Sequence, residues 1–167
     1  YWDYSGTKFV KTTYKKEPAI KLQLKNGNVN GYLDFLYYYP GEPYSPSLNG
    51  SKYRYFKIRY AYSDVTNLKE MVIGAFRAPK VSMGSAFGSK SFEVSNGYGE
   101  WCEAIVDLSD VTFEDGGVWS DSTLQMLRFF PFLDNTNTNA VCYIGGMGFF
   151  ETEEQAKTYN FESGKYG

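Results

Sequence analysis

Residues 53–62 read YRYFKIRYAY, in which apolar side chains alternate with side chains that carry a charge or a phenol. Successive side chains of a strand point to opposite faces, so this pattern predicts a strand that packs on a core from one side only. The expected core face comprises Phe56, Ile58, Tyr60 and Tyr62. The expected solvent face comprises Tyr53, Tyr55, Lys57 and Arg59.

The same alternation recurs along the chain. In residues 20–25, IKLQLK, every second side chain is apolar, and residues 33–39 behave likewise. Further candidate strands are residues 71–78, 91–94, 101–108, 124–130 and 141–150. About eight short strands predict two packed sheets.

Four Asn-Gly pairs punctuate these runs. They are Asn26-Gly27, Asn30-Gly31, Asn49-Gly50 and Asn96-Gly97. Asn and Gly tolerate the positive φ that tight hairpin turns require. The fold class is therefore expected to be all-β, an antiparallel two-sheet β-sandwich.

A short helix is expected near the C-terminus. Thr152 and Gln155 have the spacing of a capping box, in which each side chain satisfies a backbone donor of the first turn. Residues 1–161 are predicted to form a single module, and residues 162–167 the start of a linker. We interpret the chain as a piece of a longer exported protein.

Composition excludes much familiar chemistry. The chain has 167 residues, a formal charge of −2 and no histidine. Nucleophiles activated by histidine and metal sites ligated by histidine are therefore excluded. The acidic balance argues against nucleic acid, and no apolar run reaches the roughly 20 residues that cross a bilayer.

Cys102 and Cys142 are either two thiols or one disulfide, and the sequence leaves both open.

The C-terminal half carries a recognisable series of features. In order these are Gly99, Trp101, Val106-Asp107-Leu108-Ser109, Trp119, Leu127-Arg128-Phe129, residues 144–150 and Glu151-Thr152-Glu153-Glu154-Gln155-Ala156. Residues 99–159 resemble the galactose-binding-like β-sandwich jelly-roll modules of secreted and surface proteins of gut and rumen Firmicutes.

The resemblance implies a jelly roll, and many such modules bind carbohydrate. It implies packing roles for Trp101, Phe149 and Phe150, and an exported or cell-surface location. The chain departs from the family at Gly145-Gly146, where larger or polar residues are common. Paired glycines in a strand indicate a bulge or a close approach by another group.

Aromatic residues make up 19% of the chain, which is the strongest compositional signal for function. Sugar rings offer apolar C–H faces and a rim of hydroxyls, which suit flat rings flanked by polar groups. We therefore expect a non-catalytic module that binds plant or microbial polysaccharide, such as β-glucan or xylan. The candidate ligand-binding residues are Tyr53, Tyr55, Lys57, Arg59, Trp119, Gln125, Arg128, Tyr38 and Tyr44.

Several of these candidates also have a structural interpretation. Arg128 is either a ligand group or the buried partner of Asp107. Trp119 is either a stacking residue or a plug at the end of the sandwich. Rings at Tyr53 and Tyr55 are either a platform or cross-strand pairs.

Other functions remain alternatives. The same rings suit a protein–protein or surface-adhesion module, because Tyr, Trp and Arg are enriched at interface hot spots. A jelly-roll glycoside hydrolase would need two carboxylates across a cleft, for which Asp34, Glu103 and Asp107 are candidates. No cofactor is required, and a structural calcium at Asp3, Asp107 and Glu151 is the remaining option.

Overall fold

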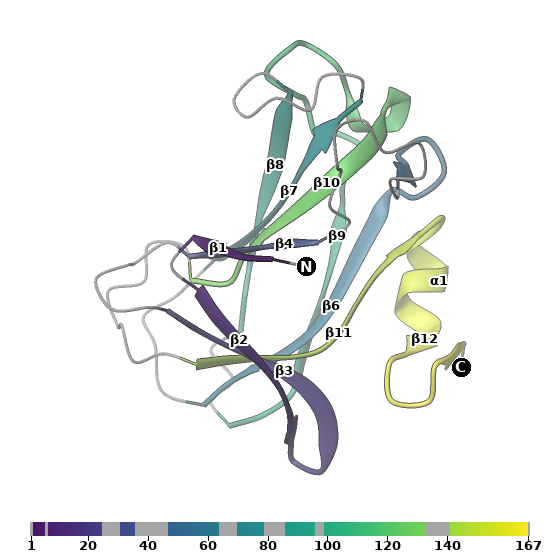
Figure 1. The fold of residues 1–167 in the computed structure, drawn as a ribbon. Helices are drawn as coiled ribbons and strands as arrows, with labels where there is room; N and C mark the ends of the chain where they lie inside the picture. The colour runs from purple at the N-terminus through teal and green to yellow at the C-terminus, as the bar shows by residue number, and fades with distance from the viewer. Residues whose placement is uncertain are drawn as a thin grey trace.

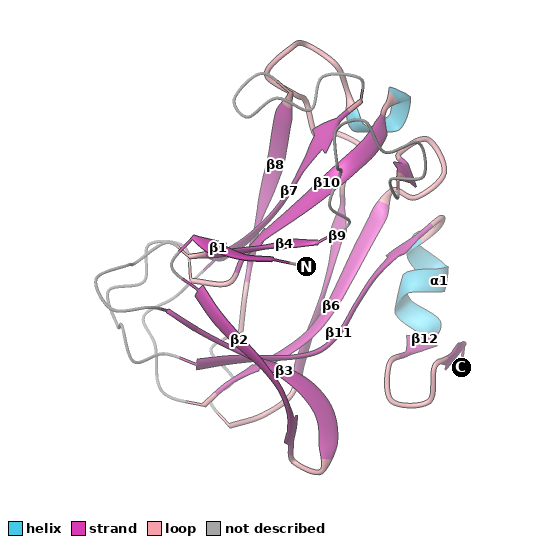
Figure 2. Ribbon diagram, in the orientation of Figure 1, coloured by secondary structure: helices cyan, strands magenta, loops and turns pink. Residues whose placement is uncertain are grey.

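The described residues form two antiparallel sheets that pack face to face, with a short α-helix outside them (Figures 1 and 2). The computed structural model describes residues 2–5, 7–24, 31–35, 47–63, 70–78, 86–95, 99–132 and 141–166. The expected two-sheet β-sandwich is confirmed.

The first sheet, sheet I, has six strands in the order β1-β4-β10-β7-β8, with β5 also paired to β10. Its strands are β1 (Trp2–Ser5), β4 (Tyr32–Phe35), β5 (Leu48–Asn49), β7 (Glu70–Arg77), β8 (Phe87–Glu93) and β10 (Thr123–Phe130).

The second sheet, sheet II, has five strands in the order β2-β3-β11-β6-β9. Its strands are β2 (Thr7–Tyr14), β3 (Glu17–Leu24), β6 (Tyr55–Tyr62), β9 (Cys102–Asp107) and β11 (Val141–Phe150). The alternation in residues 53–62 is realised here, since Phe56, Ile58 and Tyr60 are 0–1% exposed in the core.

Trp119 closes one end of the core. It begins the 3-10 helix η1 (Trp119–Asp121), and its ring is fully buried. The ring stacks on Phe113 and Phe149 at centroid distances of 6.3 and 6.2 Å, and its Nε1 donates to the Tyr53 carbonyl at 2.9 Å. Trp119 is therefore the end plug of the sandwich.

The C-terminal segment forms α1 (Glu153–Thr158) and a hairpin of β12 (Tyr159–Asn160) and β13 (Lys165–Tyr166). The predicted capping box is present, because Thr152 Oγ1 accepts from Gln155 N–H and the Gln155 side chain accepts from Thr152 N–H. This hairpin includes residues 162–166, which the sequence assigned to a linker.

The Gly145-Gly146 pair forms the expected irregularity in β11. The register with β6 shifts between Ile144 and Gly146. A Cβ on Gly145 would lie 2.9 Å from the Trp101 ring, and one on Gly146 would overlap Phe161. The glycines therefore allow a bulge and the close approach of two aromatic rings.

The β2–β3 hairpin closes through a turn that the sequence did not reveal. Tyr14 pairs with Glu17, so only Lys15 and Lys16 connect the strands. Their φ angles are 48° and 67°, in the left-handed region that Asn and Gly ordinarily occupy. The turn is therefore made by two residues poorly suited to it.

Cys102 and Cys142 are free thiols, of which Cys142 is buried and Cys102 is partly exposed. Among the described residues, no helix has the length and apolar character to cross a membrane.

Candidate functional site

The outer face of sheet II, which points away from the core, is divided into a covered half and an open half. In Figure 1, α1 and the C-terminal hairpin lie beside β6 and β11, and α1 packs against β6, β9 and β11. Lys57 lies in the covered half, with its side chain only 3% exposed. Its Nζ donates to the Tyr159 carbonyl at 2.6 Å and pairs with Glu103 at 2.9 Å.

The expectation that Lys57 faces solvent is therefore wrong. The strand periodicity places it correctly on the outer face, but a segment about 100 residues later in the chain covers that part of the face. Lys57 holds the C-terminal hairpin to the sheet.

Arg59 lies at the edge of the open half, where three carboxylates surround it. Its guanidinium is 2.8 Å from Glu162, 3.1 Å from Glu17 and 3.5 Å from Glu103. The group also lies 4.9 Å from the centre of the Trp101 ring. These contacts fix the guanidinium between the β2–β3 hairpin, the C-terminal hairpin and β9.

Arg59 lies against the ring of Trp101, which belongs to a group of three partly exposed rings that we call the aromatic patch: Tyr14, Trp101 and Tyr143. The Tyr14 and Tyr143 rings stack at 4.2 Å with an interplanar angle of 12°. Trp101 meets Tyr14 edge-on at 5.3 Å. The patch joins β2, β11 and the start of β9.

The packing role expected for Trp101 is thus corrected, because this ring lies on the outer face and not in the core. A sequence signal for it existed. Trp101 has the same strand parity as Glu103 and Asp107, so it belongs to the polar face of β9. Tyr143 likewise alternates with the buried Cys142 and Ile144.

A hollow of about 340 Å³ adjoins the patch, with Arg59, Glu17, Glu162 and Phe161 in its walls. The hollow exists because β3 pairs with β11 only as far as Ile144, after which the strands separate at Pro18 and the glycine bulge. Pro18 lacks the N–H that a continued ladder would need.

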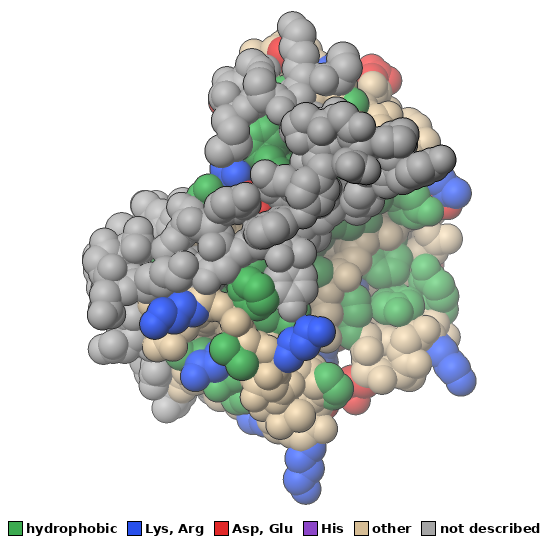
Figure 3. Space-filling model, in the orientation of Figure 1, with side chains coloured by type: hydrophobic (Ala, Val, Ile, Leu, Met, Phe, Trp, Pro, Cys, Tyr) green, Lys and Arg blue, Asp and Glu red, His purple; other side chains and the backbone are tan. Residues whose placement is uncertain are grey.

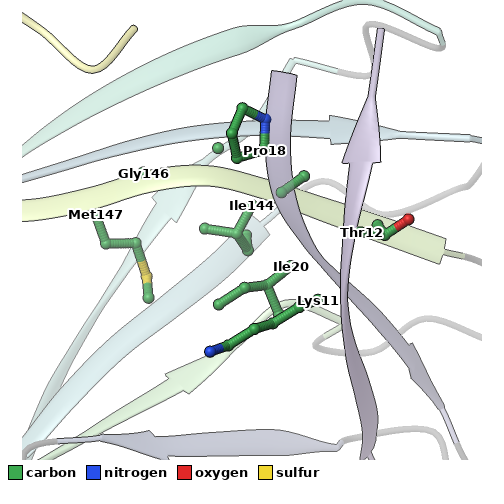
Figure 4. A pocket seen from close by; sticks show the side chains of 9 residues that line it. Lys11, Thr12, Pro18, Ile20, Ile144, Gly146 and Met147 are labelled. Carbon is green, nitrogen blue, oxygen red and sulfur yellow. The ribbon is translucent and has the colours of Figure 1, made fainter. Parts of the chain in front are cut away.

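A second, more apolar hollow of about 420 Å³ lies on the core side of the same separation (Figure 4). Ile20, Ile144 and Met147 line it, and the Lys11 side chain extends alongside Ile20. It shares Pro18 with the first hollow.

The remaining candidates are spread over other parts of the molecule. Tyr53 and Tyr55 are partly exposed at the opposite end of β6 from Arg59. Trp119 is buried, so its ring offers no face to a ligand. Tyr38 and Tyr44 lie outside the described residues.

Gln125 and Arg128 belong to β10 in sheet I, and Gln125 is partly exposed. Arg128 donates to both carboxylate oxygens of Asp34, at 2.7 and 3.1 Å, and its guanidinium lies 3.9 Å from the Tyr32 ring centre. The ion pair expected for Arg128 is present, but the partner expected from the sequence, Asp107, is wrong. Arg128 and Asp34 are register neighbours on adjacent strands.

The carboxylates named for a hydrolase do not meet across a cleft. Asp34 belongs to sheet I and is held by Arg128, whereas Glu103 pairs with Lys57 on the outer face of sheet II. Asp107 accepts from the Ser109 N–H at 2.9 Å, within its own turn. In the described parts of the chain, no three acidic or cysteine side chains gather in a way that could hold a metal ion.

The phenols with altered pKa lie in the core. Burial raises the pKa of Tyr60 to about 12 and raises the pKa of Tyr62 well above its usual value of 10.0. Burial also raises the pKa of the Cys142 thiol, which keeps it protonated and unreactive.

Comparison with known proteins found solved structures that resemble this chain. The chain is similar to a solved structure described as "Family 16 Carbohydrate Binding Module-2", with a TM-score of 0.47 and 12% identity over 88% of this chain and 86% of that one. No protein-family model and no curated protein sequence matches the chain.

Proposed function

We propose that this chain is a non-catalytic carbohydrate-binding module, and that polysaccharide lies across the open half of the outer face of sheet II. The observation that carries this proposal is the aromatic patch, in which three partly exposed rings adjoin an arginine held by carboxylates. Rings contact the apolar faces of sugars, and charged groups at their edge hydrogen-bond to hydroxyls.

The shape of the patch favours a polymer over a free monosaccharide. Its rings come from β2, β9 and β11, so they extend across the sheet instead of enclosing one ligand. The hollow beside Arg59 offers room for a sugar ring or its substituent. Ion pairs already hold Arg59 in place, which reduces the entropy lost on binding.

The carboxylates near the patch support binding without catalysis. Glu17, Glu103 and Glu162 all contact the same guanidinium, instead of facing one another across an open cleft. Glycoside hydrolysis needs one carboxyl group as acid and a second as base or nucleophile on either side of the scissile bond. Residues 99–159 resemble modules of secreted and surface proteins, and on that resemblance we also propose that the module belongs to an exported or cell-surface protein.

The test is calorimetry or affinity electrophoresis against glucans, xylans, mannans, pectins and starch. We expect one class to bind, and Trp101→Ala to weaken that binding about tenfold or more, because truncated aromatic anchors carry such losses. Tyr55→Ala is the matched control, since Tyr55 lies at the other end of β6.

A lack of binding to every polymer in the panel would favour the adhesion function instead. Release of reducing sugar by the purified chain would contradict a non-catalytic role. Equal losses from both variants would show that the aromatic patch is not the site.

A further inference from the structure

The β2–β3 hairpin carries a charge opposite in sign to that of the whole chain. Residues 7–24 contain five lysines and one glutamate, a formal charge of +4, whereas the chain as a whole carries −2. The lysines are Lys8, Lys11, Lys15, Lys16 and Lys21. Figure 3 shows blue side chains gathered over this hairpin, at the lower end of the view.

Within the part of the chain that the structure describes, carboxylates do not neutralise these lysines. None of the five forms an ion pair with a carboxylate in the described ranges. By contrast, Lys52, Lys57, Lys90 and Lys157, in other parts of the molecule, each pair with an acidic side chain. Among the described residues, the positive charge of the hairpin therefore has no carboxylate partner.

The charge adjoins the aromatic patch. Lys21 is the register partner of Tyr143 across β3 and β11. Lys15 and Lys16 directly follow Tyr14, and Lys16 also lines the hollow beside Arg59. Lys11 differs, because it is the register partner of Ile20, which packs against the core, and its side chain extends beside Ile20 (Figure 4).

The turn gives a second, independent observation. Lys15 and Lys16 adopt φ of 48° and 67°, a conformation that costs a residue with a β-carbon far more than it costs Gly. Backbone strain of this kind is concentrated at functional sites. Asn-Gly would relieve the strain but would remove both charges from the hairpin tip.

We propose that the β2–β3 hairpin binds the acid groups of an acidic polysaccharide whose sugar rings contact the aromatic patch. This inference rests on the proposed function and names the class of ligand for the same site. Each strand of the hairpin has eight residues, a length of about 26 Å at 3.3 Å per residue, which spans several sugar units. Nucleic acid fits less well, because the chain outside the hairpin is acidic.

Carboxylates and sulfates present the same chemistry to lysine, so the experiment includes both. Affinities are measured for polygalacturonate, for its methyl ester, and for a sulfated galactan beside its desulfated form. Each pair has one backbone and differs in charge. We expect at least one acidic polymer to bind roughly tenfold more tightly than its neutral form, with an affinity that falls as salt rises.

The variant pair is Lys15→Gln/Lys16→Gln against Lys157→Gln, which removes a lysine charge on α1. We expect the double variant to lose roughly 2- to 30-fold in affinity for the acidic polymer, the range for two exposed ion pairs. Lys157→Gln, the control, should retain its affinity for the acidic polymer. Circular dichroism confirms that both variants fold.

The outcomes separate this inference from the proposed function. Equal affinity for acidic and neutral polymers would overturn the inference while leaving carbohydrate binding intact, as would binding to neutral glycans only. Salt-dependent binding of DNA or anionic vesicles, with no glycan bound, would overturn both. If no glycan binds, the proposed function itself fails; if a glycan binds and Trp101→Ala leaves its affinity unchanged, the aromatic patch is not the site.

Discussion

Replacing the two lysines of the β2–β3 turn with Asn-Gly should make the protein more stable. Lys15→Asn/Lys16→Gly keeps the two-residue loop and supplies the residues that a turn with positive φ at both central positions favours. The substitution changes the backbone preference of the turn and removes two charged side chains, both of them exposed.

The expected gain follows from the two φ angles of 48° and 67°. A left-handed conformation costs a residue with a β-carbon about 1–2 kcal/mol, so relief at two positions is worth about 2–3 kcal/mol, because Asn removes only part of the cost. The glycine lowers the free energy of unfolding by about 0.5–1 kcal/mol, because it gives the unfolded chain greater conformational freedom. The free energy of unfolding should therefore rise by about 1–2 kcal/mol.

The assay is urea unfolding at constant pH, together with thermal melting. For a chain of this length, about 1–2 kcal/mol corresponds to a rise in Tm of about 2–8 °C. Lys15→Ala/Lys16→Ala is the matched control, because it removes both charges but keeps both β-carbons.

An unchanged or lower Tm for Lys15→Asn/Lys16→Gly would refute the idea that the turn is strained. An equal gain in the alanine control would refute it too, since repulsion between adjacent lysines would then be the cause. If the ligand is acidic, the more stable Asn-Gly variant should also bind it less tightly, a trade of stability for function.

Three further predictions concern the core and the C-terminal segment. Trp119→Ala should lower the free energy of unfolding by about 3–5 kcal/mol in urea titrations, because it empties a fully buried site; a loss below 1 kcal/mol would contradict the end-plug role. Lys57→Met should leave the Tyr159 carbonyl without its donor and weaken the C-terminal hairpin by about 1.5–3 kcal/mol, seen as faster hydrogen exchange in α1 with unchanged protection in sheet I. Burial raises the pKa of Tyr62, so its contribution to stability is complete below about pH 10 and is lost as pH rises further. Unfolding at stepped alkaline pH should show a shallower loss for Tyr62→Phe than for the exposed control Tyr166→Phe, and equal slopes would argue against this assignment.

Several features of the fold were predictable because they depend on neighbours in the chain. Alternation in residues 53–62 identified both faces of β6, and the capping box identified the start of α1. The glycine pair in β11 indicated its bulge. By contrast, β2 lacks clear alternation and its turn lacks an Asn-Gly pair, so this hairpin and its Tyr14 ring were missed.

For the candidate site, the sequence indicated the types of side chain better than it indicated their positions. Arg59 beside aromatic rings matches the expected combination, yet the rings come from β2, β9 and β11 instead of β6. Trp101 was expected in the core but lies on the outer face, and Trp119, for which a stacking and a plugging role were both open, is buried. The sequence around a tryptophan does not say what packs over it.

The sequence by itself determined the sheet class and which face of each regular strand meets the core, since strand periodicity is a local property. Only the tertiary structure decided which outward-facing side chains stay open to solvent. Lys57 meets a carbonyl 102 residues away, and Arg128 meets Asp34 at a separation of 94 residues. Contacts of that range depend on how the sheets and the C-terminal segment dock, and no pattern of neighbouring residues encodes them.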